Sequence, residues 1–262
     1  MSLLNKLTTE EGIGEERDTL GGGSYIWESD VYPVTVAMAY LSESQSGATA
    51  VNLVFKGKSG ELRNQQYVTS NAANGGRNYY EDKKTGEKHY LPGFNIANAI
   101  CLLAVGKELT QMTTSLRHVP VYNSVAKAEV PTEVEVLTEL LGKKLVIGVL
   151  KTRENKRAQD STGTWVATSE EKTFNEVDKI FDADKLLTVP EIRAQKTDPE
   201  FHAKWLEANK GRLNDKYKEI IGGGATGAPP RAAGGAPGAS AAAGKPKGSL
   251  FAKPAPAADP AA

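Results

Sequence analysis

Three segments rich in apolar and β-branched residues follow one another between residues 31 and 70, with glycines between them. They read VYPVTVAMAYL (31–41), TAVNLVFKG (49–57) and ELRNQQYVTS (61–70), and the last alternates more weakly than the others. Gly47 and the stretch from Gly57 to Gly60 supply the turns, because glycine adopts the backbone angles that tight turns need. The pattern predicts an antiparallel meander of three strands.

The spacing of the apolar residues changes after this meander. GFNIANAICLLAVGKEL (93–109) has apolar residues at 96, 99, 100 and 103, which predicts a helix that ends near Gly106. The elements expected after it are short strands at 118–123 and 132–137, a helical turn at 138–142, a strand at 143–153 and one or two strands at 164–181. Past Val189 we expect one or two amphipathic helices up to residue 221, with Pro199 breaking or starting one of them.

This order of elements favours a mainly β fold with helices. A three-stranded meander, a helix and a returning hairpin are expected of an OB-fold, a five-stranded and partly open Greek-key barrel. We therefore predict an OB-fold-like barrel with long hairpins, C-terminal helices and a disordered tail. The additional strands near 119–137 do not fit a minimal barrel, and an α+β sandwich is the alternative architecture.

Composition divides the chain into three regions. Residues 1–24 are polar and acidic and end in three glycines, and we expect a flexible arm. Residues 25–221 hold nearly all the large apolar side chains and form the expected domain. In residues 222–262, Ala, Gly and Pro occupy 31 of 41 positions, so this tail buries too little apolar surface to offset its ordering entropy and is expected to be disordered.

The stretch GGRNYYEDKKTGEKHYLPGF (75–94) combines aromatic and charged side chains, with an expected hairpin tip at 84–87. Proteins that hold single-stranded nucleic acid need this combination, since lysine and arginine contact phosphates while aromatic rings stack on unpaired bases. The candidate contacts in this stretch are Arg77, Tyr79, Tyr80, Lys83, Lys84, Lys88 and Tyr90. In the alternative interpretation, one of the adjacent tyrosines points inward, and Tyr90 and Phe94 pin the hairpin to the domain.

A second group of basic residues lies within 142–157, where six cations stand against Glu154 alone. We expect them on a strand and its outgoing loop, next to Trp165 across a turn at Gly163; a solvated hairpin is the alternative. The candidate contacts are Lys143, Lys144, Lys151, Arg153, Lys156, Arg157 and Trp165. Arg63 and Tyr67, on the third expected strand, add to the same surface.

Motifs typical of enzymes are absent from the sequence. The three histidines are scattered, and neither a His-Glu-x-x-His motif nor a phosphate-binding Gly-x-x-x-x-Gly-Lys-Ser/Thr motif occurs. The one cysteine, Cys101, lies in an apolar run, where we expect a buried small side chain rather than a reactive thiol. We predict no catalytic activity, no metal and no cofactor. With no apolar leader and no segment long enough to span a bilayer, we expect a soluble intracellular protein.

Three blocks of the sequence carry a family resemblance: residues 75–94, the segment AKAEVPTEVEVLTELLGKKLVIGV and the Ala/Gly/Pro-rich tail. The chain resembles the single-stranded DNA-binding proteins of lytic, short-tailed bacteriophages over roughly residues 1–221. The resemblance implies an OB-type core, cooperative coating of single-stranded DNA in phage replication and recombination in the host cytoplasm, and partners in the replication, recombination or transcription machinery. It supplies no catalytic residue.

The tail departs from many proteins of this kind, which end in acidic residues and a terminal aromatic residue. Here the tail is basic, and its one apolar element is Leu250–Phe251. The candidate partner-binding residues are therefore Lys247, Leu250, Phe251 and Lys253; a solubilising spacer is the alternative. Two other classes of function stay open: a protein-interaction factor such as a transcription co-activator that acts through its termini, and an enzyme of nucleic-acid metabolism.

Overall fold

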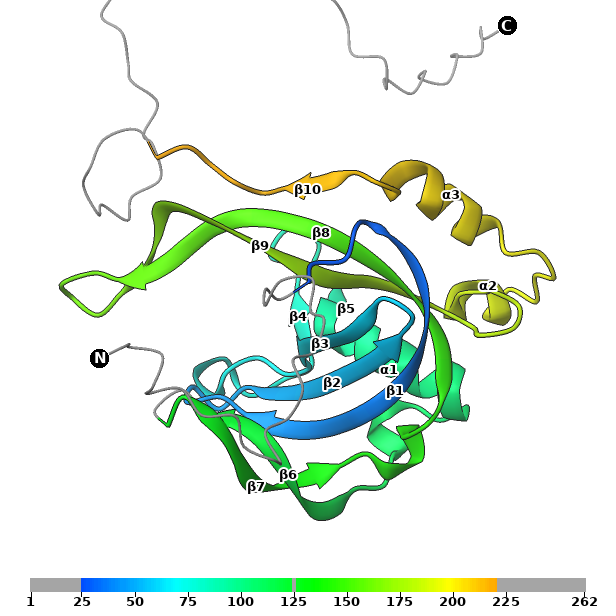
Figure 1. The fold of residues 1–262 in the computed structure, drawn as a ribbon, viewed down its shortest axis with the longest axis horizontal. Coiled ribbons are helices and arrows are strands. Elements are labelled where there is room, and N and C mark those ends of the chain that lie inside the picture. Colours follow the sequence, from blue (N-terminus) through cyan, green and yellow to red (C-terminus); the bar gives the residue numbers. More distant parts are fainter. Residues whose placement is uncertain (1–24, 124–125, 221–262) are drawn as a thin grey trace, which may run out of the picture. The chain divides into compact units, whose positions relative to one another are not determined.

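The computed structural model describes residues 25–123 and 126–220 (Figure 1). The expected acidic arm (1–24) and Ala/Gly/Pro-rich tail (222–262) lie outside the described residues. The described chain is mainly β, with three α-helices and short 3-10 turns. None of the helices in these two ranges has the length and apolar character needed to cross a membrane.

The predicted meander is confirmed. β1 (Asp30–Glu43), β2 (Thr49–Gly57) and β3 (Gly60–Tyr67) pair antiparallel in this order. Directly after the turn between β2 and β3, Gly60 begins β3 at a φ of 103°, which a residue with a side chain rarely adopts.

Two long strands continue the sheet on the other side of β1. β8 (Lys144–Gln159) pairs antiparallel with the first residues of β1, and β9 (Trp165–Phe181) pairs antiparallel with β8. β3 ends the meander on one side and β9 follows β8 on the other, and no strand pairing joins β3 to β9 within the described residues, so the sheet is not closed. An open seam therefore runs between β3 and β9.

The expected strands at 118–123 and 132–137 are longer than predicted and form a hairpin of their own. β6 (Ser115–Asn123) pairs antiparallel with β7 (Ala128–Val136), and β7 joins the main sheet where Val136 pairs with Tyr40 of β1. Figure 1 shows this hairpin beside the meander, at the bottom of the view.

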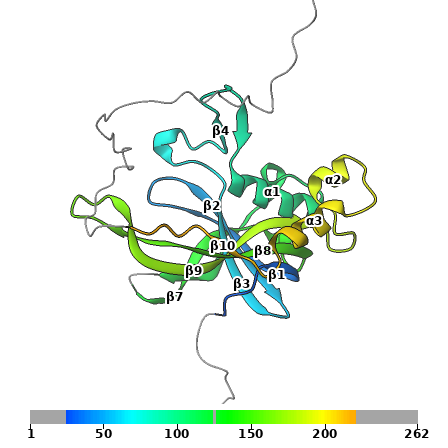
Figure 2. The same cartoon turned by 90° about the horizontal axis from the view of Figure 1, so that it is seen from above.

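The remaining elements are short. They are η2 (Ala72–Asn74), β4 (Tyr79–Glu81), β5 (Lys88–Tyr90), α1 (Pro92–Val105), η3 (Leu109–Gln111), η4 (Thr138–Leu140), α2 (Val189–Arg193), α3 (Glu200–Asn209) and β10 (Leu213–Asp215). The predicted helix ending near Gly106 is confirmed as α1, and Pro199 begins α3 as its N-cap. Both views place the three α-helices at the same end of the sheet, opposite the tip of the β8–β9 hairpin (Figures 1 and 2).

The core lies between the inner face of the sheet and α1. β1, β2 and β8 contribute buried residues such as Val36, Phe55 and Ile147, and α1 contributes Ile100. Cys101 is buried here as expected, and burial raises the pKa of its thiol to about 12.

Two expectations about the C-terminal half need correction. The strand expected at 143–153 continues to Gln159, because its partner β9 extends equally far. The helix expected up to residue 221 ends at Asn209. Gly211, at a φ of 69°, donates its N–H to the Ser29 carbonyl, and the chain then runs parallel to β8 as β10.

Candidate nucleic-acid interface

The outer face of the meander presents polar side chains in rows across three strands. Alternation along β3 places Glu61, Arg63, Gln65 and Tyr67 on this face, while Leu62 is buried. In the pairing registers, Tyr40 of β1, Asn52 of β2 and Gln65 of β3 form one row.

A β-bulge in β1 produces this arrangement. Val34 and Val36 are buried before the register shift between Val36 and Met38, whereas Ala39 is buried after it. A bulge inserts one residue and reverses which positions face the core. Tyr40 consequently lines the outer groove instead of the core.

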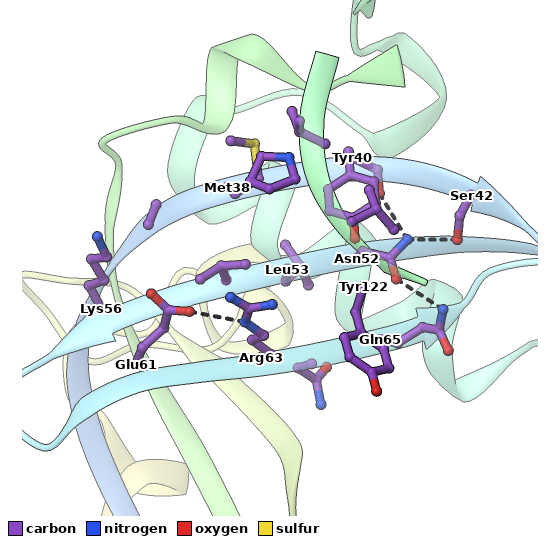
Figure 3. Close-up of a pocket in the computed structure, with 16 residues that line it drawn as sticks. Met38, Tyr40, Ser42, Asn52, Leu53, Lys56, Glu61, Arg63, Gln65 and Tyr122 are labelled. Atoms are coloured by element: carbon purple, nitrogen blue, oxygen red, sulfur yellow. Dashed lines mark hydrogen bonds and ion pairs between the residues drawn. The ribbon is translucent and has the colours of Figure 1, made fainter. Parts of the chain in front are cut away.

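The β6–β7 hairpin turns this face into a groove of about 600 Å³. Its floor comes from the meander and its wall from β6. Among the residues that line it are Tyr40, Asn52, Lys56, Arg63, Gln65 and Tyr122 (Figure 3). The ring of Tyr122 is 60% exposed, and Tyr40 is half-buried. The groove thus combines two aromatic rings, amide groups and two cations.

Hydrogen bonds hold the amide groups in place. Asn52 Nδ2 donates to Ser42 Oγ over 2.7 Å, and Gln65 Nε2 donates to Asn52 Oδ1 over 2.9 Å. An amide has two donors and two acceptor sites, so each side chain keeps hydrogen-bonding capacity for a ligand in the groove. Figure 3 shows these bonds between neighbouring strands.

Arg63 is the main cation of the groove, and two carboxylates hold it. Its Nε lies 3.0 Å from Glu61 Oε1, and its Nη1 lies 2.9 Å from Glu129 Oε1 on β7. These hydrogen bonds raise the pKa of Arg63 above its ordinary value. The Arg63–Glu129 pair ties the β6–β7 hairpin to β3, and a bound phosphate would compete with Glu129 for the guanidinium.

The aromatic stretch 75–94 forms the predicted hairpin, in which β4 and β5 pair Tyr79 with Tyr90 and Tyr80 with His89. Tyr79 is half-buried and Tyr80 is 48% exposed, so the two neighbours face different surroundings. Tyr90 stacks on the buried Phe94 at a centroid distance of 4.8 Å yet stays 56% exposed. Tyr90 therefore packs against Phe94 and at the same time keeps its own ring accessible to a ligand.

Cations surround this hairpin. The Arg77 guanidinium lies 5.8 Å and Lys88 Nζ lies 5.3 Å from the centre of the Tyr79 ring. Lys83 and Lys84 are exposed in the turn. Asp82 accepts hydrogen bonds from the Lys84 and Thr85 backbone N–H groups, which lower its pKa. Tyr80, Lys88 and Tyr90 also line a hollow together with Gln66 of β3 and residues 176–179 of β9.

The structure spreads the second basic group out. Because β8 is one continuous strand, Lys144 and Arg157 are separated by thirteen steps along it, up to about 43 Å of extended chain at 3.3 Å per residue. Lys143 and Lys144 adjoin the middle of β1, whereas Arg157 and Trp165 lie near the hairpin tip, where Trp165 pairs with Gln159 and is 60% exposed. We expected one cluster on a strand and its outgoing loop. The structure instead separates these residues into a group beside β1 and a group near the tip of the β8–β9 hairpin.

Carboxylates pair with three of these cations. Lys151 contacts Glu28, Arg153 contacts Asp215 and Glu171, and Lys156 contacts Glu170. The hydrogen bond with Asp215 raises the pKa of Arg153. Over residues 25–123 and 126–220, no carboxylate lies within ion-pair distance of the remaining candidates, which are Arg77, Lys83, Lys84, Lys88, Lys143, Lys144 and Arg157.

Sequence reasoning missed most of the groove. Of its candidates only Arg63 lines it, and Tyr67 stands exposed on the same face at the end of β3. The missed residues are Tyr40, Asn52, Lys56, Gln65 and Tyr122. Side-chain alternation in the meander could have indicated Asn52 and Gln65. It could not have indicated Tyr40, which the bulge turns outward, or Tyr122, which the β6–β7 hairpin brings to the groove. The tail candidates Lys247, Leu250, Phe251 and Lys253 lie outside the described residues.

The part of the chain that the structure describes contains no group of three or more His, Cys, Asp or Glu side chains suited to a metal ion. The arrangement instead offers rings, amides and cations on an outer sheet face. In comparisons with known proteins, the chain matches no protein-family model and no curated protein.

Proposed function

We propose that this chain binds single-stranded DNA without sequence preference, in the groove over β1, β2 and β3. The observation that carries the proposal is the set of groups lining that groove: two tyrosine rings, three amides and two cations, with Glu61 as the one carboxylate among the lining residues. Each kind of group has a counterpart in a single strand, namely unpaired base faces, base edges and phosphates.

The individual roles follow from exposure and chemistry. Tyr122 is the main stacking ring because most of it is exposed, and Tyr40 supports a second base from the floor. Asn52 Nδ2 already donates to Ser42 Oγ and to the Tyr40 carbonyl, so Asn52 meets base edges through its remaining acceptor site, whereas Gln65 offers both a donor and acceptor sites. Lys56 and Arg63 contact phosphates, with Arg63 exchanging Glu129 for the nucleic acid.

We also propose that the five strands β1, β2, β3, β8 and β9 form an OB-type barrel left open between β3 and β9. Supporting this are the meander, α1 between the third and fourth of these strands, and the pairing of β8 with β1 and β9. OB-folds bind oligonucleotides over the face of their second and third strands, which here are β2 and β3.

Further contacts in the proposal come from outside the groove. Tyr67 stands exposed on the groove face at the end of β3, and the hairpin residues Tyr80, Lys88 and Tyr90 offer a second aromatic and basic surface in the hollow that Gln66 lines. Arg157 and Trp165 extend it from the tip of the β8–β9 hairpin. The proposed setting, phage DNA replication and recombination with protein partners for the tail, rests on the family resemblance and includes no catalytic step.

Fluorescence anisotropy with a short labelled oligonucleotide, compared with the duplex of the same sequence, tests the proposal. We expect the full chain to bind the single strand, and to bind it far more tightly than the duplex, since only unpaired bases can stack in the groove. Equal affinity for both, or no binding of the single strand at low salt, contradicts the proposal. The Tyr122→Ala variant then locates the site.

A further inference from the structure

A second groove, of about 460 Å³, lies between α1, β9, α2 and α3. Its apolar lining comes from Ile96, Ala99, Ile180, Val189, Pro190 and Phe201. Phe201 is 37% exposed, and Ile96 is only partly buried. A groove of this kind offers apolar side chains to a segment that covers them.

The rim of this groove is basic. Lys179, Lys196 and Lys204 line it, against Glu191 and Glu200. Glu200 pairs with both Lys196 and Lys204. Glu191 is buried and accepts hydrogen bonds from the backbone N–H groups of Thr188 and Phe201. Lys179 has no carboxylate within ion-pair distance among the described residues. An occupant with an apolar residue flanked by acids matches this pattern.

A trough connects the first described residues to this groove through three hollows that share residues. Tyr25 lines the first hollow, together with Gln66 and Glu176. Gln66 and Glu176 also line the second hollow, along the open seam between β3 and β9. The second hollow shares Asn95, Ile96 and Lys179 with the groove.

Two hydrogen bonds hold Trp27 against β9 at the beginning of this trough. Trp27 N donates to Asn175 Oδ1 over 2.8 Å, and Asn175 Nδ2 donates to the Trp27 carbonyl over 2.7 Å. Lys179 lies four residues further along β9, about 13 Å at 3.3 Å per residue. The twelve residue-to-residue steps from Ile13 to Tyr25 can span up to about 40 Å. Ile13 of the same chain can therefore reach the groove.

The charges of the two terminal segments decide which of them fits this groove. Ile13 is flanked by Glu10 and Glu11 on one side and by Glu15 and Glu16 on the other. The apolar pair of the C-terminal segment, Leu250–Phe251, stands instead among the cations Lys245, Lys247 and Lys253, which the lysine rim would repel. The acidic N-terminal segment fits the groove and the basic C-terminal segment does not.

We propose that residues 10–18 dock in the groove between α1 and α3 of their own chain, with Ile13 against Phe201 and Ile96. The flanking glutamates then face Lys179, Lys196 and Lys204, and the chain between them and Tyr25 follows the seam along β9. This docking does not depend on the proposed DNA binding.

Paramagnetic broadening in the full chain tests the proposal. Gly14→Cys carries a nitroxide label and leaves its neighbour Ile13 in place. The native Cys101 stays unlabelled because it is buried and the pKa of its thiol is raised to about 12. We expect loss of the amide signals of Ile96, Ala99 and Phe201 at low salt. The signals should return at high salt or on reduction of the nitroxide.

Charge variants provide the control. Lys179→Glu/Lys204→Glu should restore the groove signals, and Lys204→Glu alone should restore them in part. The matched variant Lys58→Glu/Lys127→Glu makes the same charge change at two exposed turn residues outside the groove and should leave the broadening unchanged. Broadening that survives Lys179→Glu/Lys204→Glu in a folded protein overturns the proposal.

Two further outcomes identify another occupant and also overturn the proposal. If labelled protein broadens the groove signals of an isotope-enriched, unlabelled copy, the segment comes from a second molecule. If the label has no effect but a short single-stranded oligonucleotide shifts the groove signals, the groove belongs to the nucleic-acid interface. Neither outcome bears on whether the groove over β1–β3 binds DNA.

Discussion

Gln65 and Asn52 face each other across the pairing of β3 with β2, and Gln65 Nε2 donates a hydrogen bond to Asn52 Oδ1 over 2.9 Å. Both side chains stand on the outer face of the meander, in a groove that also holds Tyr40 and Tyr122. Their mutual bond orients the amides before a ligand arrives, which lowers the entropy cost of binding. The groove is therefore preorganised for a ligand whose groups both stack and hydrogen-bond.

Tyr122→Ala should weaken binding of single-stranded DNA by about 1–3 kcal/mol, the range found for the loss of one stacked base. The melting temperature should change little, because the ring is 60% exposed. Leu116→Ala is the matched control, since Leu116 is exposed on the same strand but does not line the groove. Equal effects of the two substitutions in an anisotropy titration contradict a specific role for Tyr122.

Glu129→Gln should strengthen binding of single-stranded DNA by about two- to fivefold at low salt, the size expected for one exposed ion pair. Glu129 holds Arg63 Nη1 at 2.9 Å, so its neutral isostere leaves Nη1 available for a phosphate while Glu61 still holds Nε. Glu133→Gln, on the same strand and outside any ion pair among the described residues, serves as the control. A loss of affinity in Glu129→Gln contradicts the competition between Glu129 and DNA.

The salt dependence of binding should separate free cations from paired ones. Lys83→Gln/Lys84→Gln should reduce the slope of log K against log salt by about 0.7 for each phosphate that the variant no longer neutralises. Lys156→Gln should change the slope less for each charge removed, because Lys156 Nζ already lies 3.0 Å from Glu170. Equal changes in slope for each charge removed show that ion pairing in the free protein does not decide which cations bind phosphate.

Glu191 lies beside the groove between α1 and α3. Its charge should make the free energy of unfolding depend on pH. Burial acts to raise the pKa of Glu191, but hydrogen bonds from Thr188 and Phe201 outweigh it and lower the pKa. A carboxylate with a lowered folded-state pKa stabilises the fold above its unfolded-state pKa of about 4.3. That contribution is lost as pH falls through the folded-state pKa.

Glu191→Gln should therefore cost on the order of 1 kcal/mol of unfolding free energy at neutral pH, the value of a typical hydrogen bond. The difference in unfolding free energy between Glu191→Gln and the unchanged protein should disappear at acidic pH. Urea unfolding across the acidic range measures it, with Glu207→Gln of α3 as an exposed control. A gap that stays constant with pH contradicts the role of the Glu191 charge.

The sequence alone determined the order of the elements up to α3, but not β10, where it predicted helix. The meander at 31–70, the helix before Gly106 and the turn at 84–87 all follow from local signals, namely side-chain periodicity and glycine or proline at defined positions. These signals depend on neighbours within a few residues. The burial of Cys101 followed from its apolar surroundings in the same way.

The tertiary structure decided the candidate site. The bulge between Val36 and Met38 turns Tyr40 outward, the β6–β7 hairpin brings Tyr122 to the meander, and Glu129 reaches Arg63 from a distant strand. It also divided the basic residues of β8 into paired and free cations. None of this is written in local periodicity, because a register shift, a strand partner and an ion pair depend on groups far apart in the chain that only folding brings together.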